Sequence, residues 1–245
     1  MRMLGRFLIG VGFAALMGSS ASAALLEPRL HLRPSAEATP RVALTLDACG
    51  GKTDARILSA LIDNKIPATI FVTGKWLKRN AEALAVMRAH PELFELENHG
   101  AEHLPAVDTP RSIYGLKSAG STEAVQAEVV AGALALTERG GPAPKWFRGA
   151  TAQYSKSSIA LIRSLGFRIA GYSINGDGGS LLGARETERR VSSAKDGDVI
   201  IAHINQPTHA AGGGLVKGLL ALKAKGYAFV RLDDVEDDGT DDTTN

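Results

Sequence analysis

Two histidines that lie four positions apart, His99 and His103, are the side chains that could most readily act together in chemistry. They follow by about fifty residues an acidic turn, TLDACGG, which contains Asp47. Imidazoles at this spacing can bind one divalent ion, and a carboxylate at a strand end can meet them only if the fold gathers the loops. The sequence therefore predicts a metal-dependent hydrolase on a barrel or sheet.

The same histidine pair permits a second interpretation. The string HGAEH matches the His-x-x-Glu-His pattern of certain zinc proteases, in which both histidines lie on one helix and Glu102 would be the base. Gly100 within the string and Pro105 just after it disfavour a long helix. The loop-borne metal site is thus favoured, and the helical protease site is its alternative.

Short apolar segments alternate with amphipathic ones through most of the chain. Strands are predicted at 41–46, 68–72, 92–97, 146–148, 168–174, 199–203 and 228–232. Helices are predicted at 55–62, 80–89, 123–138, 157–165, 186–195 and 215–225. We expect Asp54 to cap the first of these helices. The alternation predicts a single-domain α/β fold with a parallel barrel or sheet.

Five polar side chains fall where predicted strands end. Asp47, His99, Arg148, Asp177 and His203 each occur at the end of a different strand or in the loop after it. In parallel α/β folds the chemistry lies at the carboxyl edge of the strands. We therefore expect these five side chains to share one site.

The two ends of the chain differ from its middle. Residues 1–23 combine Arg2 and Arg6 with an apolar run and a small-residue stretch ending at Ala23, as a cleaved signal peptide does. The apolar run is shorter than the roughly 20 residues that span a bilayer, so we expect export to the periplasm or the medium without stable membrane insertion. We expect a linker at 24–40, a catalytic domain at 41–235 and a disordered acidic tail at 236–245.

The composition excludes some classes of protein. A hydrophobic content of 44% and a charged content of 22% are those of an ordinary globular protein, and a net charge of +2 is too small to indicate a nucleic-acid partner. The single cysteine, Cys49, cannot form an internal disulfide. Its thiol is a softer possible ligand for zinc, but a lone thiol of this kind is most often a small buried apolar side chain, and we expect that of Cys49.

Five segments in order resemble the motifs of the polysaccharide deacetylase family, carbohydrate esterase family 4. They are TLDACGG, HGAEH, FRGATAQY, INGDGG and IIAHINQP, within about residues 41 to 235. The resemblance implies a deformed (β/α) TIM-like barrel and a divalent metal cofactor, usually zinc. It also implies that the substrate is an acetylated glycan from which an N-acetyl or O-acetyl group is hydrolysed.

The resemblance also implies roles for individual residues. His99 and His103 match the family's metal-binding histidines, and Asp47 matches its general base. Arg148 matches the arginine that holds the base ionised, because an opposite charge lowers the pKa of a carboxylate. His203 matches the general acid, and Asp177 matches the aspartate of the fourth motif, which would orient the reacting groups.

The sequence departs from the family pattern in three places. Ala48 occupies the position of the family's third metal ligand, so Asp47 is left either as the base or as a ligand. Gly178 stands where a tryptophan often lines the acetyl pocket, and the loop after Arg148 lacks the usual prolines. Two alternatives follow from these departures: a glycan-binding module that has lost catalysis, and an amidase for a small non-glycan substrate.

Overall fold

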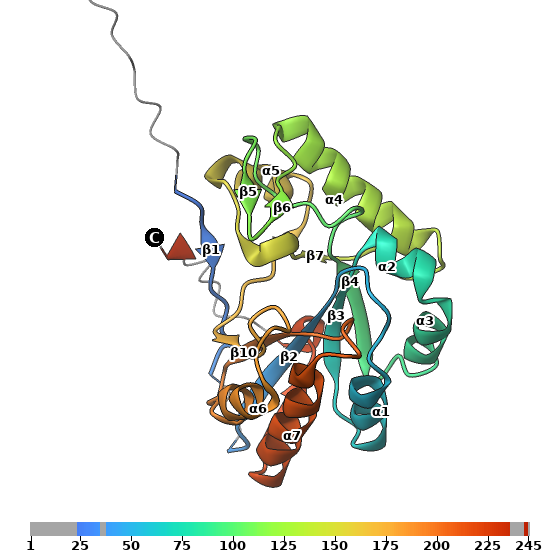
Figure 1. Cartoon of the computed structure of the whole chain (residues 1–245), viewed down its shortest axis with the longest axis vertical. Helices are drawn as coiled ribbons and strands as arrows, with labels where there is room; N and C mark the ends of the chain where they lie inside the picture. The colour runs from blue at the N-terminus through green and yellow to red at the C-terminus, as the bar shows by residue number, and fades with distance from the viewer. Residues whose placement is uncertain (1–23, 35–37, 236–242, 245) are drawn as a thin grey trace, which may run out of the picture.

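A parallel sheet curled into a half-barrel forms the centre of the molecule, which is described here by a computed structural model covering residues 24–34, 38–235 and 243–244 (Figure 1). The sheet has eight strands in the order β8-β7-β4-β3-β2-β10-β9, and β11 pairs with the start of β2. The strands are β2 (Arg41–Ala48), β3 (Ala68–Val72), β4 (Phe94–Asn98), β7 (Trp146–Phe147), β8 (Arg168–Ile169), β9 (Ile174–Asn175), β10 (Val199–His203) and β11 (Ala228–Val230). The predicted single-domain, deformed barrel is confirmed.

Helices cover the outer face of this sheet (Figure 1). They are α1 (Ala55–Asp63), α2 (Gly74–Arg79), α3 (Ala81–Arg88), α4 (Thr122–Thr137), α5 (Lys156–Ser164), α6 (Ala184–Ser192) and α7 (Ala210–Ala224). Asp54 caps α1 as expected, since its side chain accepts a hydrogen bond of 3.0 Å from the Arg56 amide. Helix α2 was not predicted. Its N-cap is Thr73, whose hydroxyl accepts a hydrogen bond from the Trp76 amide, and the apolar periodicity of the sequence does not reveal this cap.

Alternation along the strands separates an outer core from an inner one. Leu44, Leu46 and Ala48 of β2 pack outward in the large apolar cluster beneath the helices. Ala43 of the same strand belongs instead to the inner cluster, which fills the barrel with side chains such as Phe71 and Trp146. Asp47 lies on this inward-facing set, one residue from the outward Ala48.

The predicted strand at 168–174 is instead two short strands. β8 ends at Ile169 and β9 begins at Ile174. Between them, the carbonyl oxygens of Ala170 and Gly171 accept hydrogen bonds of 3.1 Å each from the Arg148 guanidinium. The segment therefore satisfies part of its backbone with a side chain rather than with a sheet partner.

The segment at 24–34, expected to be part of a linker, packs against the barrel. We call residues 26–32 the strap. Leu26 exchanges two backbone hydrogen bonds of 2.9 Å with Tyr154, and the Leu32 amide donates to the Gly197 carbonyl. Leu30 is 3% exposed and belongs to the inner core. β8 and β9 are the two edge strands of the sheet, which is open between them. The strap runs across this opening, from Tyr154 after β7 to Gly197 before β10. Burial of its leucines explains why a proline-containing segment is ordered here.

The remaining strands are short and lie outside the main sheet. β5 (Ser112–Ile113) pairs with β6 (Leu116–Lys117), and β1 (Glu27–Pro28) pairs with β12 (Thr243–Thr244). The predicted signal peptide and most of the predicted acidic tail lie outside the described residues. Among the residues that are described, no helix has both the length and the apolar character needed to cross a membrane.

Candidate active site

The carboxyl ends of the strands bring the predicted site residues together. Asp47 and His203 are paired across β2 and β10, so both side chains emerge at the same level of the sheet. His99 follows β4 directly, and Arg148 follows β7, which pairs with β4. Asp177 lies just after β9, beside β10.

Asp47 and Arg148 form a fully buried ion pair. The Arg148 Nη1 donates to Asp47 Oδ1 at 3.0 Å, and Arg148 is 0% exposed. Its other donors reach Thr45 Oγ1 and the carbonyls between β8 and β9, and its guanidinium lies over the Phe71 ring. Burial by itself would raise the pKa of Asp47, but the neighbouring charges of His99 and Arg148 outweigh it and lower that pKa. The carboxylate is thereby held ionised and oriented.

Three potential metal ligands converge beside this pair. The ligand atoms of Cys49, His99 and His103 all lie within 4.8 Å of one another. Cys49 Sγ is 3.6 Å from His99 Nε2, and Asp47 Oδ2 is 3.7 Å from the same nitrogen. Cys49 is half-buried and lies beside these imidazoles, rather than in an apolar core as expected from the sequence. This mixture of imidazole and thiolate donors suits a borderline-soft divalent ion such as zinc.

The histidine loop is held in place by side chains that the sequence motifs did not indicate. His99 Nδ1 donates a hydrogen bond of 2.6 Å to the Arg148 carbonyl, which leaves Nε2 free to face an ion. Metal-binding histidines typically donate their second ring N–H in this way. Buried Glu128 of α4 accepts bonds from the amides of Glu102 and Leu104. Residues 99–104 form no helix, so the zinc protease interpretation is wrong. Gly100 has φ +83°, and a side chain there would collide with Glu128.

His203 and Asp177 form a second charged pair on the opposite side of the group. His203 Nδ1 lies 3.0 Å from Asp177 Oδ1, and the His203 amide donates to Asp177 Oδ2 at 2.7 Å. Burial opposes the charged imidazolium, but the Asp177 carboxylate outweighs this and raises the pKa of His203 well above its ordinary value. Asp177 thus keeps the ring oriented and able to hold a proton.

These groups open onto one cavity of about 680 Å³, which Asp47, Cys49, His103 and His203 all line. The volume lies in the range of small-molecule binding sites. Its wall differs from the family pattern where the sequence predicted a reshaped loop. Thr151 and the residue after it, Ala152, have positive φ, and the buried Thr151 hydroxyl has no hydrogen-bond partner. Gly178, also in the lining, has φ +57°.

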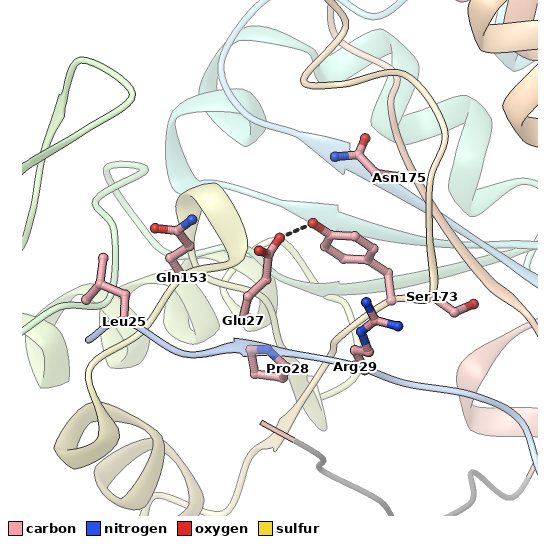
Figure 2. A pocket seen from close by; sticks show the side chains of 8 residues that line it. Leu25, Glu27, Pro28, Arg29, Gln153, Ser173 and Asn175 are labelled. Atoms are coloured by element: carbon pink, nitrogen blue, oxygen red, sulfur yellow. Dashed lines mark hydrogen bonds between the residues drawn. The ribbon is translucent and has the colours of Figure 1, made fainter. Parts of the chain in front are cut away.

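A second cavity, of about 620 Å³, adjoins the first along the strap. Figure 2 shows its lining, in which a dashed line joins Glu27 to the hydroxyl of Tyr172. Glu27, Tyr172 and Asn175 line both cavities, so the two hollows share a wall. Arg29 and Gln153 add polar groups to the second one. Sequence patterns do not indicate this extension, because they predict a linker at 24–40.

A different acidic group lies farther down the same inward face of β4. Glu95, Glu97 and Asp233 have carboxylate oxygens within 4.8 Å of one another. Burial raises the pKa of Glu95 to about 7 and that of Glu97 to about 9. Glu97 accepts bonds of 2.9 and 2.8 Å from the amides of Lys145 and Trp146. Protons and backbone donors thus satisfy the Glu97 carboxyl group, whereas the buried Glu95 Oε1 has no hydrogen-bond partner.

Comparison with known proteins identifies the family of this protein. A family model described as polysaccharide deacetylase matches residues 35–170. No curated protein matches. Among solved structures, a deacetylase with bound substrate is 25% identical over 80% of this chain and 89% of its own, with a TM-score of 0.62.

Two more distant structures share the fold. A family 4 acetyl xylan esterase from Clostridium thermocellum, solved with a cobalt ion, is 22% identical over 79% of this chain and 89% of its own, with a TM-score of 0.63. A pseudoenzyme of carbohydrate esterase family 4 from Bacillus anthracis is 18% identical over 81% of this chain and 66% of its own, with a TM-score of 0.63. Because the family model covers more than half of the 245 residues, this protein belongs to the polysaccharide deacetylase family.

Proposed function

We propose that this protein is an exported, metal-dependent hydrolase that removes acetyl groups from a glycan. One observation carries the proposal: the Asp47–Arg148 pair, the histidine ligands and the His203–Asp177 pair all lie around a single cavity. A base, an ion-binding group and an acid in one place are what hydrolysis of an amide or ester requires.

His99 and His103 would hold the divalent ion. Bound there, zinc would supply Lewis-acid polarisation of the acyl carbonyl and make water a stronger acid. Asp47 takes the proton from the attacking water, since its carboxylate is ionised and faces the same group. Arg148 positions Asp47 through one hydrogen bond and is itself fixed by three others, so the base cannot rotate away from the water.

His203 completes the reaction as the general acid. Its Nδ1 is engaged by Asp177, so Nε2 is the atom that can give a proton to the leaving group. As the bond between the acyl carbon and the sugar nitrogen breaks, this proton converts the nitrogen to an amine, and the water oxygen stays with the acetate. Asp177 stabilises the imidazolium until that transfer.

The shape of the cavities favours a polymeric substrate over a small amide. The catalytic cavity continues into the second one, and the wall between them presents a carboxylate, a phenol and an amide. Side chains of this kind bind sugar hydroxyls by hydrogen bonds. A neighbouring sugar unit would occupy the second cavity while the acetylated unit lies beside Asp47 and His203.

The first experiment uses the protein from residue 24 to its end, with metal removed and then restored. Acetate release from acetylated chitooligosaccharides and from peptidoglycan should appear with about one ion per chain and disappear without it. D47N should bind the ion but release acetate at least about 100-fold more slowly. Binding to these glycans with neither metal nor acetate release would refute the hydrolase and favour the binding module that Ala48 suggests.

Export is tested separately in the producing cell. The mature protein should begin at Ala24 and be recovered outside the cytoplasm. An intact Met1 on protein recovered there would contradict the predicted cleavage.

A further inference from the structure

Ala48 stands where the family has its third metal ligand, and an alanine side chain cannot bind a metal. Ala48 is 0% exposed and packs in the outer apolar cluster beneath the helices. Its neighbour Cys49, the first residue beyond β2, faces the opposite way and lines the catalytic cavity. A donor atom is therefore supplied one position later along the chain.

We infer that Cys49 is the third protein ligand of the metal, in a site formed by two imidazoles and one thiolate. The inference rests on the proposed function and names the ion-binding group of that same site. Thiolate is a ligand that zinc binds strongly, and sites with cysteine and histidine together are known for catalytic zinc. The chain thus keeps three protein ligands although it has lost the family's carboxylate.

The separation of the donor atoms supports this assignment. In a tetrahedral site with sulfur at about 2.3 Å and nitrogen at about 2.0–2.1 Å from the ion, sulfur and nitrogen lie about 3.6 Å apart. Cys49 Sγ and His99 Nε2 are 3.6 Å apart. His103 brings its ring to 5.0 Å from that of His99, measured between centroids, and adds the third donor.

A thiolate ligand also resolves the double role of Asp47. With Cys49, His99 and His103 as ligands, one position of a four-coordinate ion remains open. Asp47 then need not bind the ion and is free to act as the base, as its ion pair with Arg148 allows. The soft sulfur donor should shift metal preference toward zinc and cobalt and away from magnesium and manganese.

The thiol has a second possible use, because Cys49 also lies beside His203, which Asp177 orients. A cysteine next to such a histidine could attack the acyl carbon itself. The metal assignment is favoured because the sulfur meets two further imidazoles at ligand spacing, and because His99 makes the outer hydrogen bond of a metal-binding histidine.

Cobalt(II) provides the test, because a thiolate ligand gives a sulfur-to-cobalt charge-transfer band in the near ultraviolet. The mature protein loaded with cobalt should show this band. C49S should lose it and bind zinc at least about 100-fold more weakly in a chelator competition. C49D, which restores a carboxylate ligand, should lose the band but regain much of the zinc affinity and part of the acetate release.

A matched control keeps a thiol in the protein but moves it. C49S/S164C carries its cysteine at an exposed position on α5 and should behave like C49S. Folding of every variant is checked by circular dichroism and thermal unfolding. A charge-transfer band in C49S/S164C would contradict the assignment, because the sulfur would then come from elsewhere.

Two other results would overturn the inference, and a third would separate it from the proposed function. Cobalt binding without the band, with full acetate release, would show that Cys49 is not a ligand although the hydrolase is real. Unchanged zinc affinity in C49S, together with an acetylated Cys49 trapped in the parent protein, would show a nucleophile instead. Absence of acetate release from the parent, despite the band, would sink the proposed function but support the ligand.

Discussion

Two groups of potential metal ligands lie along the same face of β4, and their charge and surroundings differ. At the carboxyl end, His99 joins Cys49 and His103, and Asp47 beside them is kept ionised by Arg148. Lower on the strand, Glu95 and Glu97 meet the third acidic side chain, Asp233.

Charge balance accounts for the difference. The upper group mixes basic donors with anions and opens onto a cavity, so it can accept an ion and a substrate. The lower group brings like charges together in a buried place, which raises the pKa of Glu95 and Glu97. Protonation, the backbone amides that bind Glu97 and the Lys145 ammonium on Asp233 then offset most of the negative charge of this group. Glu95, Glu97 and His99 follow one another at intervals of two residues, so their spacing does not distinguish them. The surroundings decide which group can do chemistry.

The largest effect should come from removing a ligand at the upper group. H99A should weaken zinc binding by more than about 100-fold and reduce acetate release to background, because it removes one of the side chains that would bind the ion directly. E97Q on the same strand is the matched control and should leave metal content unchanged. Metal content by elemental analysis measures both. Loss of the ion from E97Q but not from H99A would reverse the comparison.

The base should be separable from the ligands. D47N should lower kcat by about 10²–10⁴-fold, since it removes proton transfer, while the ion stays bound. Steady-state kinetics and metal content are measured together. If D47N lost the ion as well, Asp47 would be a ligand rather than the base.

The buried pair at the upper group should also contribute to stability. R148M leaves the Asp47 carboxylate buried without its partner and should lower the free energy of unfolding by about 3–5 kcal/mol. The double variant D47N/R148M should recover part of that loss, because no buried charge remains. Unfolding in denaturant measures the free energy of unfolding of each variant. If the double variant were as unstable as R148M, the unpaired charge of Asp47 would not be the cause of the lost stability.

The lower group predicts a pH dependence with a definite sign. The pKa of Glu97 is about 9 in the folded protein and near 4.5 in the unfolded chain, so between these values the folded state binds more protons. Its contribution to stability is therefore fully present below pH 4.5 and is lost as the pH rises toward 9.

E97Q should flatten this dependence and stabilise the protein at pH 8 by up to about 5 kcal/mol, because an amide does not ionise and each pKa unit corresponds to about 1.4 kcal/mol. Unfolding by urea at a series of pH values compares it with the parent. Equal slopes in the two proteins would mean that Glu97 is not the titrating group.

The smallest effect is expected at the strap. E27Q should raise KM by roughly tenfold for longer chitooligosaccharides, since a hydrogen bond to a charged group is worth about 1.5–3 kcal/mol, and leave kcat and the KM of the shortest substrate nearly unchanged. S164A, at an exposed position of α5 that lines neither cavity, is the control. An equal rise in KM for every chain length would place Glu27 outside a sugar subsite.

Much of the fold followed from local patterns. The strands at 68–72 and 199–203 were predicted at their observed bounds, because a run of β-branched apolar residues buried on both faces has few other conformations. The strap and the break at 170–173 were not predicted. Both depend on partners distant in sequence: the strap on Tyr154 and Gly197, and the break on Arg148.

The sequence by itself determined which residue types were available and that each would stand at a strand end, because hydrophobic alternation and turn chemistry are local properties. Tertiary structure alone decided what those residues became. It turned the thiol of Cys49 toward two imidazoles, buried Ala48 away from them and anchored the histidine loop on Glu128. It also placed His99 and Glu97, two residues apart on one face, in different surroundings: His99 joins a group of potential metal ligands, and Glu97 joins a group of acidic side chains in which burial raises its pKa. Charge, burial and hydrogen-bond partners set these outcomes, and all three depend on which strands and helices lie side by side.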